Sequence, residues 1–291
     1  MVRKMWKNVG VFSIAVALIA GSGLTMNAIL SSKTFAETDK QILQQQPDHN
    51  QPIEAPGKTE TAAEYTVIDQ SKSLTKDELM NSTKMKGASQ QEKEQWVDGI
   101  QSTYVPGDKD MTAEQAAAYG ATVLKKAFGA NLSGYTAKAM FLRGPLPGSD
   151  TWTVVFNPNQ SAKAAANAAK RYNVSLNSVN GNLINASSFD DATNSAPTHA
   201  DGNDPVLLKL AEQTVADLLP KNVSISSTKV GTTENPRFGV PVVCQLSNGT
   251  AYVVGITGQG EEKEVINLYY FQNGYDGSLE KTMNQQKGMK Q

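Results

Sequence analysis

The feature of this sequence that most constrains its fold is an order of predicted elements that occurs twice. Each time, a helix with a recognisable N-terminal cap is followed by several strand-like runs. The first helix is predicted from the capping box Thr112-Ala-Glu-Gln115, which satisfies backbone donors at a helix start, and it ends at Gly129. The second begins at Asp204-Pro205, an N-cap with proline in the first helical position, and ends before Pro220.

Strand-like runs follow both helices, and two of them, 151–156 and 172–176, alternate in the side chains that they place on each face. After the first helix these runs are 135–142, 151–156, 172–176 and a short run from Leu183; after the second they are 223–230, 239–246, 250–256 and 264–271. We therefore predict an α+β fold with two small helix-on-antiparallel-sheet units, 111–190 and 204–280. Units of this size are marginally stable alone, so we expect them to pair into one assembly.

The N-terminal segment 1–36 predicts export. Arg3, Lys4 and Lys7 precede an uncharged stretch, 9–30, which as a helix would span roughly 33 Å, enough to cross a bilayer core. Basic residues before the stretch place the bulk of the chain outside the cytoplasm. Two interpretations stay open: a plasma-membrane anchor over residues 9–30 with the C-terminus outside, or a signal peptide cleaved near Ala36, which would release a secreted protein.

The segments around the two units have weaker patterns. Residues 37–64 are rich in Gln, Pro and charged residues, which predicts a disordered linker. Residues 65–110 contain two capping boxes, at Thr75 and Ser89, and are expected to form partly ordered short helices. The alanine-rich segment 161–170 is interpreted as a solvated flap, and 281–291 as a flexible C-terminal tail.

Composition excludes several classes of function. The formal net charge of −1 offers no basic field for nucleic-acid binding. One cysteine, Cys244, and two histidines, His49 and His199, exclude a disulfide framework and a thiolate zinc site. We predict no catalytic, cofactor-binding or metal-binding residues. Cys244 lies in an apolar run and is interpreted as a buried, inert thiol.

Two further groups of side chains are candidates for ligand binding. Four aspartates lie between the units: Asp190, Asp191, Asp201 and Asp204. They suggest oxygen ligands for calcium, but their spacing does not fit the twelve-residue calcium loop. We therefore prefer to interpret them as solvated turn residues. Tyr269, Tyr270 and Phe271 form the densest aromatic run. In a strand, Tyr269 and Phe271 share one face and Tyr270 points to the other, so one face is core and the exposed one is a candidate peptide contact.

The first unit resembles a PepSY-type module, a small extracytoplasmic α+β domain of bacterial envelope proteins and some protease propeptides. The resemblance rests on EQAAAYGATVLKKAFG (114–129), TWTVVFNP (151–158) and RYNVSLNSVNGNL (171–183), and extends more weakly to the second unit. These are core and turn residues, so no catalytic role is carried over. The resemblance implies binding or inhibition of peptides, proteases or envelope partners.

The first functional hypothesis is therefore a binding or regulatory module of a bacterial cell envelope. It would engage a peptide or protein through exposed sheet edges or a helix–sheet groove, without catalysis and without a cofactor. The alternatives are a secreted protease inhibitor or propeptide-like domain, a secreted hydrolase that uses Cys244 or carboxylates, and a purely structural spacer.

Overall fold

The computed structural model describes residues 64–159, 170–189, 201–231, 239–258 and 263–279. The predicted anchor or signal peptide, most of the linker, most of the alanine-rich segment and the C-terminal tail lie outside these residues, as do His49, His199, Asp190 and Asp191. Within the described part, none of the helices has the length and apolar character needed to span a membrane.

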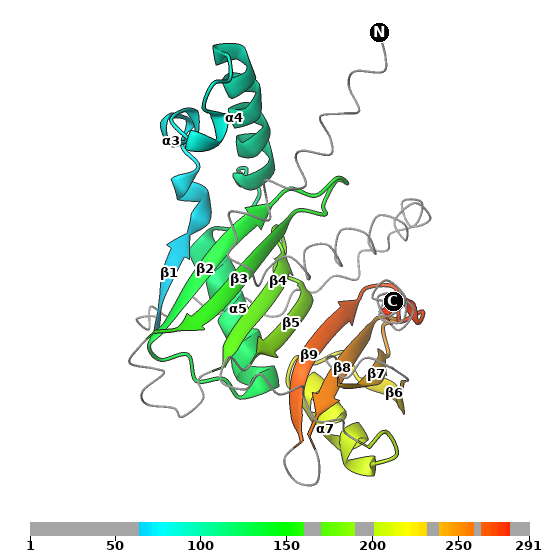
Figure 1. Cartoon of the computed structure of the whole chain (residues 1–291). Coiled ribbons are helices and arrows are strands. Elements are labelled where there is room, and N and C mark those ends of the chain that lie inside the picture. Colours follow the sequence, from blue (N-terminus) through cyan, green and yellow to red (C-terminus); the bar gives the residue numbers. More distant parts are fainter. Residues whose placement is uncertain (1–63, 160–169, 190–200, 232–238, 259–262, 280–291) are drawn as a thin grey trace, which may run out of the picture. The chain divides into compact units, whose positions relative to one another are not determined.

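The fold is α+β, with a nine-stranded mixed sheet in the order β1-β2-β3-β4-β5-β9-β8-β7-β6 (Figure 1). Most strands coincide with the predicted runs to within two residues, because alternation and richness in β-branched and aromatic residues are local properties of the chain. The strands are β1 Tyr65–Asp69, β2 Tyr135–Leu142, β3 Thr151–Pro158, β4 Arg171–Asn177, β5 Leu183–Phe189, β6 Ile225–Val230, β7 Val240–Leu246, β8 Ala251–Thr257 and β9 Glu264–Phe271.

The sheet joins two antiparallel runs of strands, β2 to β5 and β6 to β9, through their last strands. The junction between β5 and β9 is antiparallel and pairs Asn185 with Tyr269, Ala186 with Leu268 and Ser187 with Asn267. The expected pair of small antiparallel sheets is thus corrected in one respect: both runs belong to a single continuous sheet.

A second correction concerns the segment 65–110. Its first five residues, Tyr65–Asp69, form β1, which pairs in parallel with β2 from Tyr65↔Tyr135 to Asp69↔Ala139 and makes the sheet mixed. Short helices were expected throughout this segment. A strand this short carries little periodic signal of its own, and its partner lies far along the chain, so its conformation depends on tertiary pairing.

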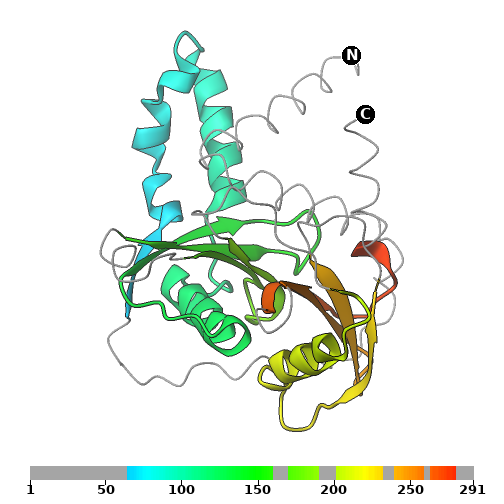
Figure 2. The same ribbon diagram turned by 60° about the horizontal axis from the view of Figure 1, so that its bottom comes forward.

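Two helices cover the same face of the sheet (Figure 2). α5 spans Ala113–Phe128 and begins with the predicted capping box at Thr112, and α7 spans Pro205–Ala216 with Asp204 as its N-cap. Residues of both helices share one buried core with the strands beneath them. We call this side of the sheet the inner face and the opposite side the outer face.

Small residues allow α5 to lie close to the sheet. Ala116 and Ala117 are fully buried, and a Cβ atom placed on Gly120 would lie 3.4 Å from the ring of Phe156. The largest fully buried side chain, Trp152 of β3, lies on this inner face and donates from Nε1 to the carbonyl oxygen of Met111 at 2.9 Å. Met111, which precedes the N-cap of α5, is therefore tied to β3.

A helical arm precedes α5. It contains α3 (Lys76–Met80) and α4 (Gln90–Tyr104), which contact each other, together with the 3₁₀ turns Gln70–Ser73 and Thr83–Met85. The capping box expected at Ser89 starts α4, whereas at Thr75 only the threonine hydroxyl caps α3: it accepts from the backbone N–H of Glu78 and donates to the Glu78 carboxylate. Both helices thus lie within the segment where short helices are predicted.

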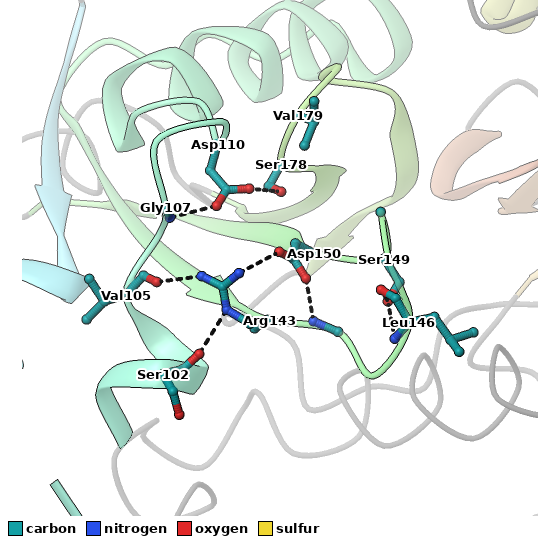
Figure 3. A network of polar contacts seen from close by, with 12 residues as sticks. Ser102, Val105, Gly107, Asp110, Arg143, Leu146, Ser149, Asp150, Ser178 and Val179 are labelled. Carbon is teal, nitrogen blue, oxygen red and sulfur yellow. Dashed lines mark hydrogen bonds and ion pairs between the residues drawn. The ribbon is translucent and has the colours of Figure 1, made fainter. Parts of the chain in front are cut away.

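Arg143, directly after β2, connects the arm to the sheet (Figure 3). Its guanidinium donates from Nε to the carbonyl oxygen of Ser102 at 2.9 Å and from Nη2 to that of Val105 at 3.1 Å, and Nη1 pairs with Asp150 at 3.2 Å. The carboxylate of Asp150 also accepts from the backbone N–H of Gly144. One side chain thus binds the C-terminal end of α4 and the loop between β2 and β3 together.

Candidate functional site

The N-terminus of α7 is held at the sheet by an ion pair. Asp204, the N-cap, accepts from the backbone N–H of Val206 at 2.8 Å, and its carboxylate lies 2.6 Å from the ammonium of Lys263, one residue before β9. These hydrogen bonds and the positive charge lower the pKa of Asp204. α7 is therefore held at its first turn across the inner face of the second half of the sheet.

β6 forms one edge of the described sheet and pairs only with β7. The backbone N–H of Gly231 donates to the carbonyl oxygen of Pro241 at 2.7 Å, which makes these two residues a hydrogen-bonded pair. Because hydrogen-bonding direction alternates along an antiparallel strand, the backbone groups of Thr228 and Val230 point away from β7. They present a backbone donor and acceptor ladder at the sheet edge.

A cavity of about 430 Å³, open to solvent, lies between this edge strand and α7. We call it the edge groove; it is lined by Glu212, Gln213, Ala216, Ile225, Ser226, Ser227 and Thr228. The helix contributes the first three of these residues and β6 the other four. Among these described lining residues only Glu212 carries a formal charge, and Ala216 and Ile225 supply apolar surface. The groove therefore combines an exposed backbone edge, a small apolar contact and one carboxylate.

Cys244 lies one strand away from the edge groove and is fully buried, as the sequence predicts. Burial raises the pKa of its thiol from 9.0 to about 12, and the nearby charge of Glu212 also raises it. The proposed base, His199, lies outside the described residues. A nucleophilic cysteine needs the opposite conditions, partial exposure and a lowered pKa.

The two described aspartates of the predicted inter-unit cluster have local roles. Asp204 caps α7, and Asp201 accepts from the backbone N–H of Asn203 at 2.9 Å. In the part of the chain that the structure describes, no group of three or more histidine, cysteine, aspartate or glutamate side chains is close enough to hold a metal ion.

The aromatic run in β9 divides between the two faces as predicted. Tyr270 lies on the inner face, where its ring centroid is 5.1 Å from that of its cross-strand partner Tyr252. Tyr269 and Phe271 lie on the outer face, and the Phe271 ring makes an edge contact of 4.8 Å with Tyr275. Both residues are partly exposed, although burial raises the pKa of the Tyr269 phenol.

The outer face contains polar side chains that, apart from Tyr269, the sequence patterns did not point to. Where β4, β5 and β9 lie next to one another, two cross-strand rows cross the junction between the halves of the sheet. We call them the polar rows: Ser175, Asn185 and Tyr269 form the first, and Asn173, Ser187 and Asn267 form the second. In β4 and β5 these polar residues alternate with inner-face residues such as Val174 and Ala186, and this alternation could have placed them on the outer face. It does not reveal that β5 and β9 lie next to each other.

Two oxygen atoms in the second row have no hydrogen-bond partner. Asn173 is 4% exposed and Ser187 is 3% exposed, and the two residues lie directly opposite each other in the β4–β5 ladder. Asn173 Oδ1 and Ser187 Oγ are both buried without a partner. Each such atom lowers the stability of the fold by about 1–3 kcal/mol relative to an atom that has a hydrogen-bond partner. Its presence therefore calls for an explanation.

Comparison with known proteins provides no relative: no family model matches the chain, and neither the curated proteins nor the solved structures contain a match.

Proposed function

We propose that this protein is a non-catalytic binding module of a bacterial cell envelope that takes an extended peptide segment of its partner as an additional strand beside β6. The observation that carries the proposal is the edge groove, in which the outward backbone groups of an edge strand lie next to a cavity lined by α7. An added strand gains affinity from main-chain hydrogen bonds, and pockets for its alternate side chains provide specificity.

The groove also indicates which peptides would fit. Side chains of an added strand alternate between the two faces of the sheet, so every second one would enter the cavity below β6. Ala216 and Ile225 would contact a small apolar side chain there, and Glu212 would attract a basic one. We therefore expect a β-prone peptide with a basic residue and a small apolar residue two positions apart.

The proposal includes the finer organisation inferred from the sequence. We propose that the two halves are related units of the PepSY type, each a helix followed by four antiparallel strands, and the element order α5, β2–β5 and α7, β6–β9 supports this. We also propose an extracytoplasmic location, by membrane anchoring or by secretion, which the basic and uncharged N-terminal sequence supports. Cell fractionation with N-terminal sequencing of the product tests the location, and recovery of the chain in the cytosol would overturn it.

Binding is tested with the full-length chain and two fluorescein-labelled peptides of about six residues, the usual length of a strand. Both alternate valine and threonine; one carries a central arginine and the other a glutamate. We expect the arginine peptide to bind several-fold more tightly, since an exposed ion pair is worth about 0.2–1 kcal/mol. Glu212→Gln should remove this preference, and Asp217→Asn, which changes the exposed C-cap residue of α7 outside the groove lining, should retain it.

The edge-strand mode is tested by Thr228→Pro, which removes an outward N–H at a position where an edge strand tolerates proline. Thr228→Val is the matched control, because it keeps the N–H and the side-chain shape. Loss of binding only in the proline variant, with both variants folded by circular dichroism, supports the added strand. Equal binding by the two variants, or no binding by the wild type, contradicts it, and cleavage of the peptide would instead favour a hydrolase.

A further inference from the structure

The edge strand β6 carries a charge that does not line the edge groove. Thr228 pairs with Cys244 of the inner-face core, so the next residue, Lys229, which pairs with Val243, lies on the outer face. Lys229 is exposed, and in the part of the chain that the structure describes no acid forms an ion pair with it. The edge therefore has a positive charge on its outer face and, at Glu212, a negative charge on its inner face.

We infer that the strand added beside β6 runs antiparallel to it and carries opposite charges on its two faces; this inference rests on the proposed function. An acidic residue of the partner lies opposite Lys229 on the outer face. The residue after it is basic and points towards Glu212 in the edge groove. A small apolar residue follows two positions later, towards Ile225. The partner segment thus has the order acid, base, any residue, small apolar residue.

The geometry of the ladder places Lys229 close to the added strand. The backbone groups of Thr228 and Val230 point away from β7, so those of Lys229 point towards β7. In an antiparallel pair, Lys229 and the residue opposite it would share no hydrogen bond, and pairs of this kind have the closest Cα atoms, about 4.5 Å apart. A lysine on an edge strand discourages pairing with other strands, whereas an acid directly opposite it is stabilising.

The inner face determines the order of the residues. The charge of Glu212 raises the pKa of the Cys244 thiol, and Thr228 lies directly opposite Cys244, so a base opposite Thr228 is within the field of Glu212. Side chains two positions apart on a strand share one face. The next inner-face residue on one side therefore lies towards Ile225, at the start of β6. In an antiparallel strand this residue follows the base in sequence, and antiparallel pairing is slightly more stable per residue than parallel pairing.

The order and direction are tested with the full-length chain and three end-capped, fluorescein-labelled peptides of identical composition. Thr-Val-Glu-Arg-Thr-Val has the inferred order, Val-Thr-Arg-Glu-Val-Thr is its reversal, and Thr-Val-Arg-Glu-Thr-Val exchanges the two charges. We expect fluorescence anisotropy to show the first peptide binding several-fold more tightly than the other two. Equal or tighter binding of the reversed peptide would contradict the antiparallel direction, and equal or tighter binding of the exchanged peptide would contradict the placement of the charges.

The outward contact is tested by Lys229→Glu with a fourth peptide, Thr-Val-Lys-Arg-Thr-Val, which differs from the first only at the position opposite Lys229. The wild type should prefer the glutamate peptide and Lys229→Glu the lysine peptide. Lys126→Glu makes the same change of charge at an exposed residue of α5 and should keep the wild-type preference.

The outcomes separate this inference from the proposed function. If Thr228→Pro abolishes binding while Lys229→Glu leaves the preference unchanged, a peptide does bind at the edge and only the inference is wrong. A preference that Lys126→Glu shifts as much as Lys229→Glu would reflect net charge and would also overturn the inference. If the wild type binds none of the four peptides, the proposed function fails, and the inference fails with it.

Discussion

Thr228 lies directly opposite Cys244 in the β6–β7 ladder, on the inner face that α7 covers. Thr228 also lines the edge groove, so the only thiol of the chain lies directly behind a groove residue. The thiol is therefore buried between the sheet and α7 rather than by β6 alone.

We expect the stability of the folded chain to fall above pH 9, in part because of Cys244. Its pKa is raised to about 12 in the folded state, so above pH 9 the unfolded chain loses a proton that the folded chain retains. Unfolding then becomes more favourable by up to about 1.4 kcal/mol per pH unit until the folded pKa is reached. Urea unfolding at pH 8 and at pH 10.5 should differ by about 2 kcal/mol from this group alone.

Cys244→Ala is the control for this pH dependence. Other buried groups, among them Tyr172 with a pKa raised to about 12 by burial, also destabilise the fold in alkali, and they remain in the variant. The difference in slope between wild type and Cys244→Ala isolates the thiol. Parallel pH profiles for the two proteins would show that the thiol is ordinarily ionisable in the folded state.

Removal of the Arg143 side chain should loosen the helical arm without unfolding the sheet. Arg143→Ala loses two hydrogen bonds to carbonyl oxygens at the end of α4, each worth about 0.5–1.5 kcal/mol. Its ion pair with Asp150 adds little, because the arginine side chain is 42% exposed. Hydrogen exchange of residues 90–104 should accelerate, while exchange in 113–128 stays unchanged.

Asp150→Asn is the matched control for the arm, since it removes the ion pair but keeps a side-chain oxygen that can accept from the N–H of Gly144. We expect a small effect on exchange in the arm. Equal acceleration in both variants would mean that charge, rather than the carbonyl contacts, holds α4 to the loop between β2 and β3.

Two glycines with positive φ should respond very differently to alanine. Gly239 has φ of 67°, and a Cβ atom there would lie 2.4 Å from the carbonyl oxygen of Ile256; Gly249 has φ of 85° with nothing within 4 Å. We expect Gly249→Ala to cost about 1–2 kcal/mol from the left-handed backbone alone. Gly239→Ala adds a clash with backbone and should cost about 2–5 kcal/mol. Similar midpoints in urea would contradict the close contact before β7.

Gly120→Ala, in contrast, should stabilise the protein. Its new methyl group would be 3.4–3.5 Å from Phe156 and Val174, close to ordinary contact, and alanine in a helix interior is worth about 0.5–1 kcal/mol more than glycine. Urea unfolding should show a gain of up to about 1 kcal/mol. A loss would show that α5 packs against β3 and β4 too tightly for a single methyl group.

Local patterns predicted the elements well. The capping residues Thr112 and Asp204 start α5 and α7 where expected, because a cap depends only on residues within one helical turn. The runs 135–142 and 264–271 form strands with the predicted bounds, because the first alternates between buried and more exposed residues and the second is rich in β-branched and aromatic residues. The burial of Cys244 followed from its apolar neighbours.

The sequence predicted what type of binding feature to expect but not where in the fold it would lie. Exposed sheet edges and a helix–sheet groove were expected features of a binding module, yet nothing in the run 223–230 marks it as the edge strand, and Glu212 is one of many exposed acids. The sequence did not reveal the polar rows either, because they form only where strands from the two halves adjoin. Asn185 and Tyr269 belong to different halves of the chain, and their alignment depends on which strands adjoin.

The sequence by itself determined the helices, most of the strands and the α+β class, since periodicity and capping act over a few residues. Only the tertiary structure decided that β5 pairs with β9, that β1 adds a parallel strand and that β6 is left at the edge. The physical reason is that backbone hydrogen bonding in a sheet is nearly indifferent to sequence, so the choice of partner strand depends on burying both halves in one shared core.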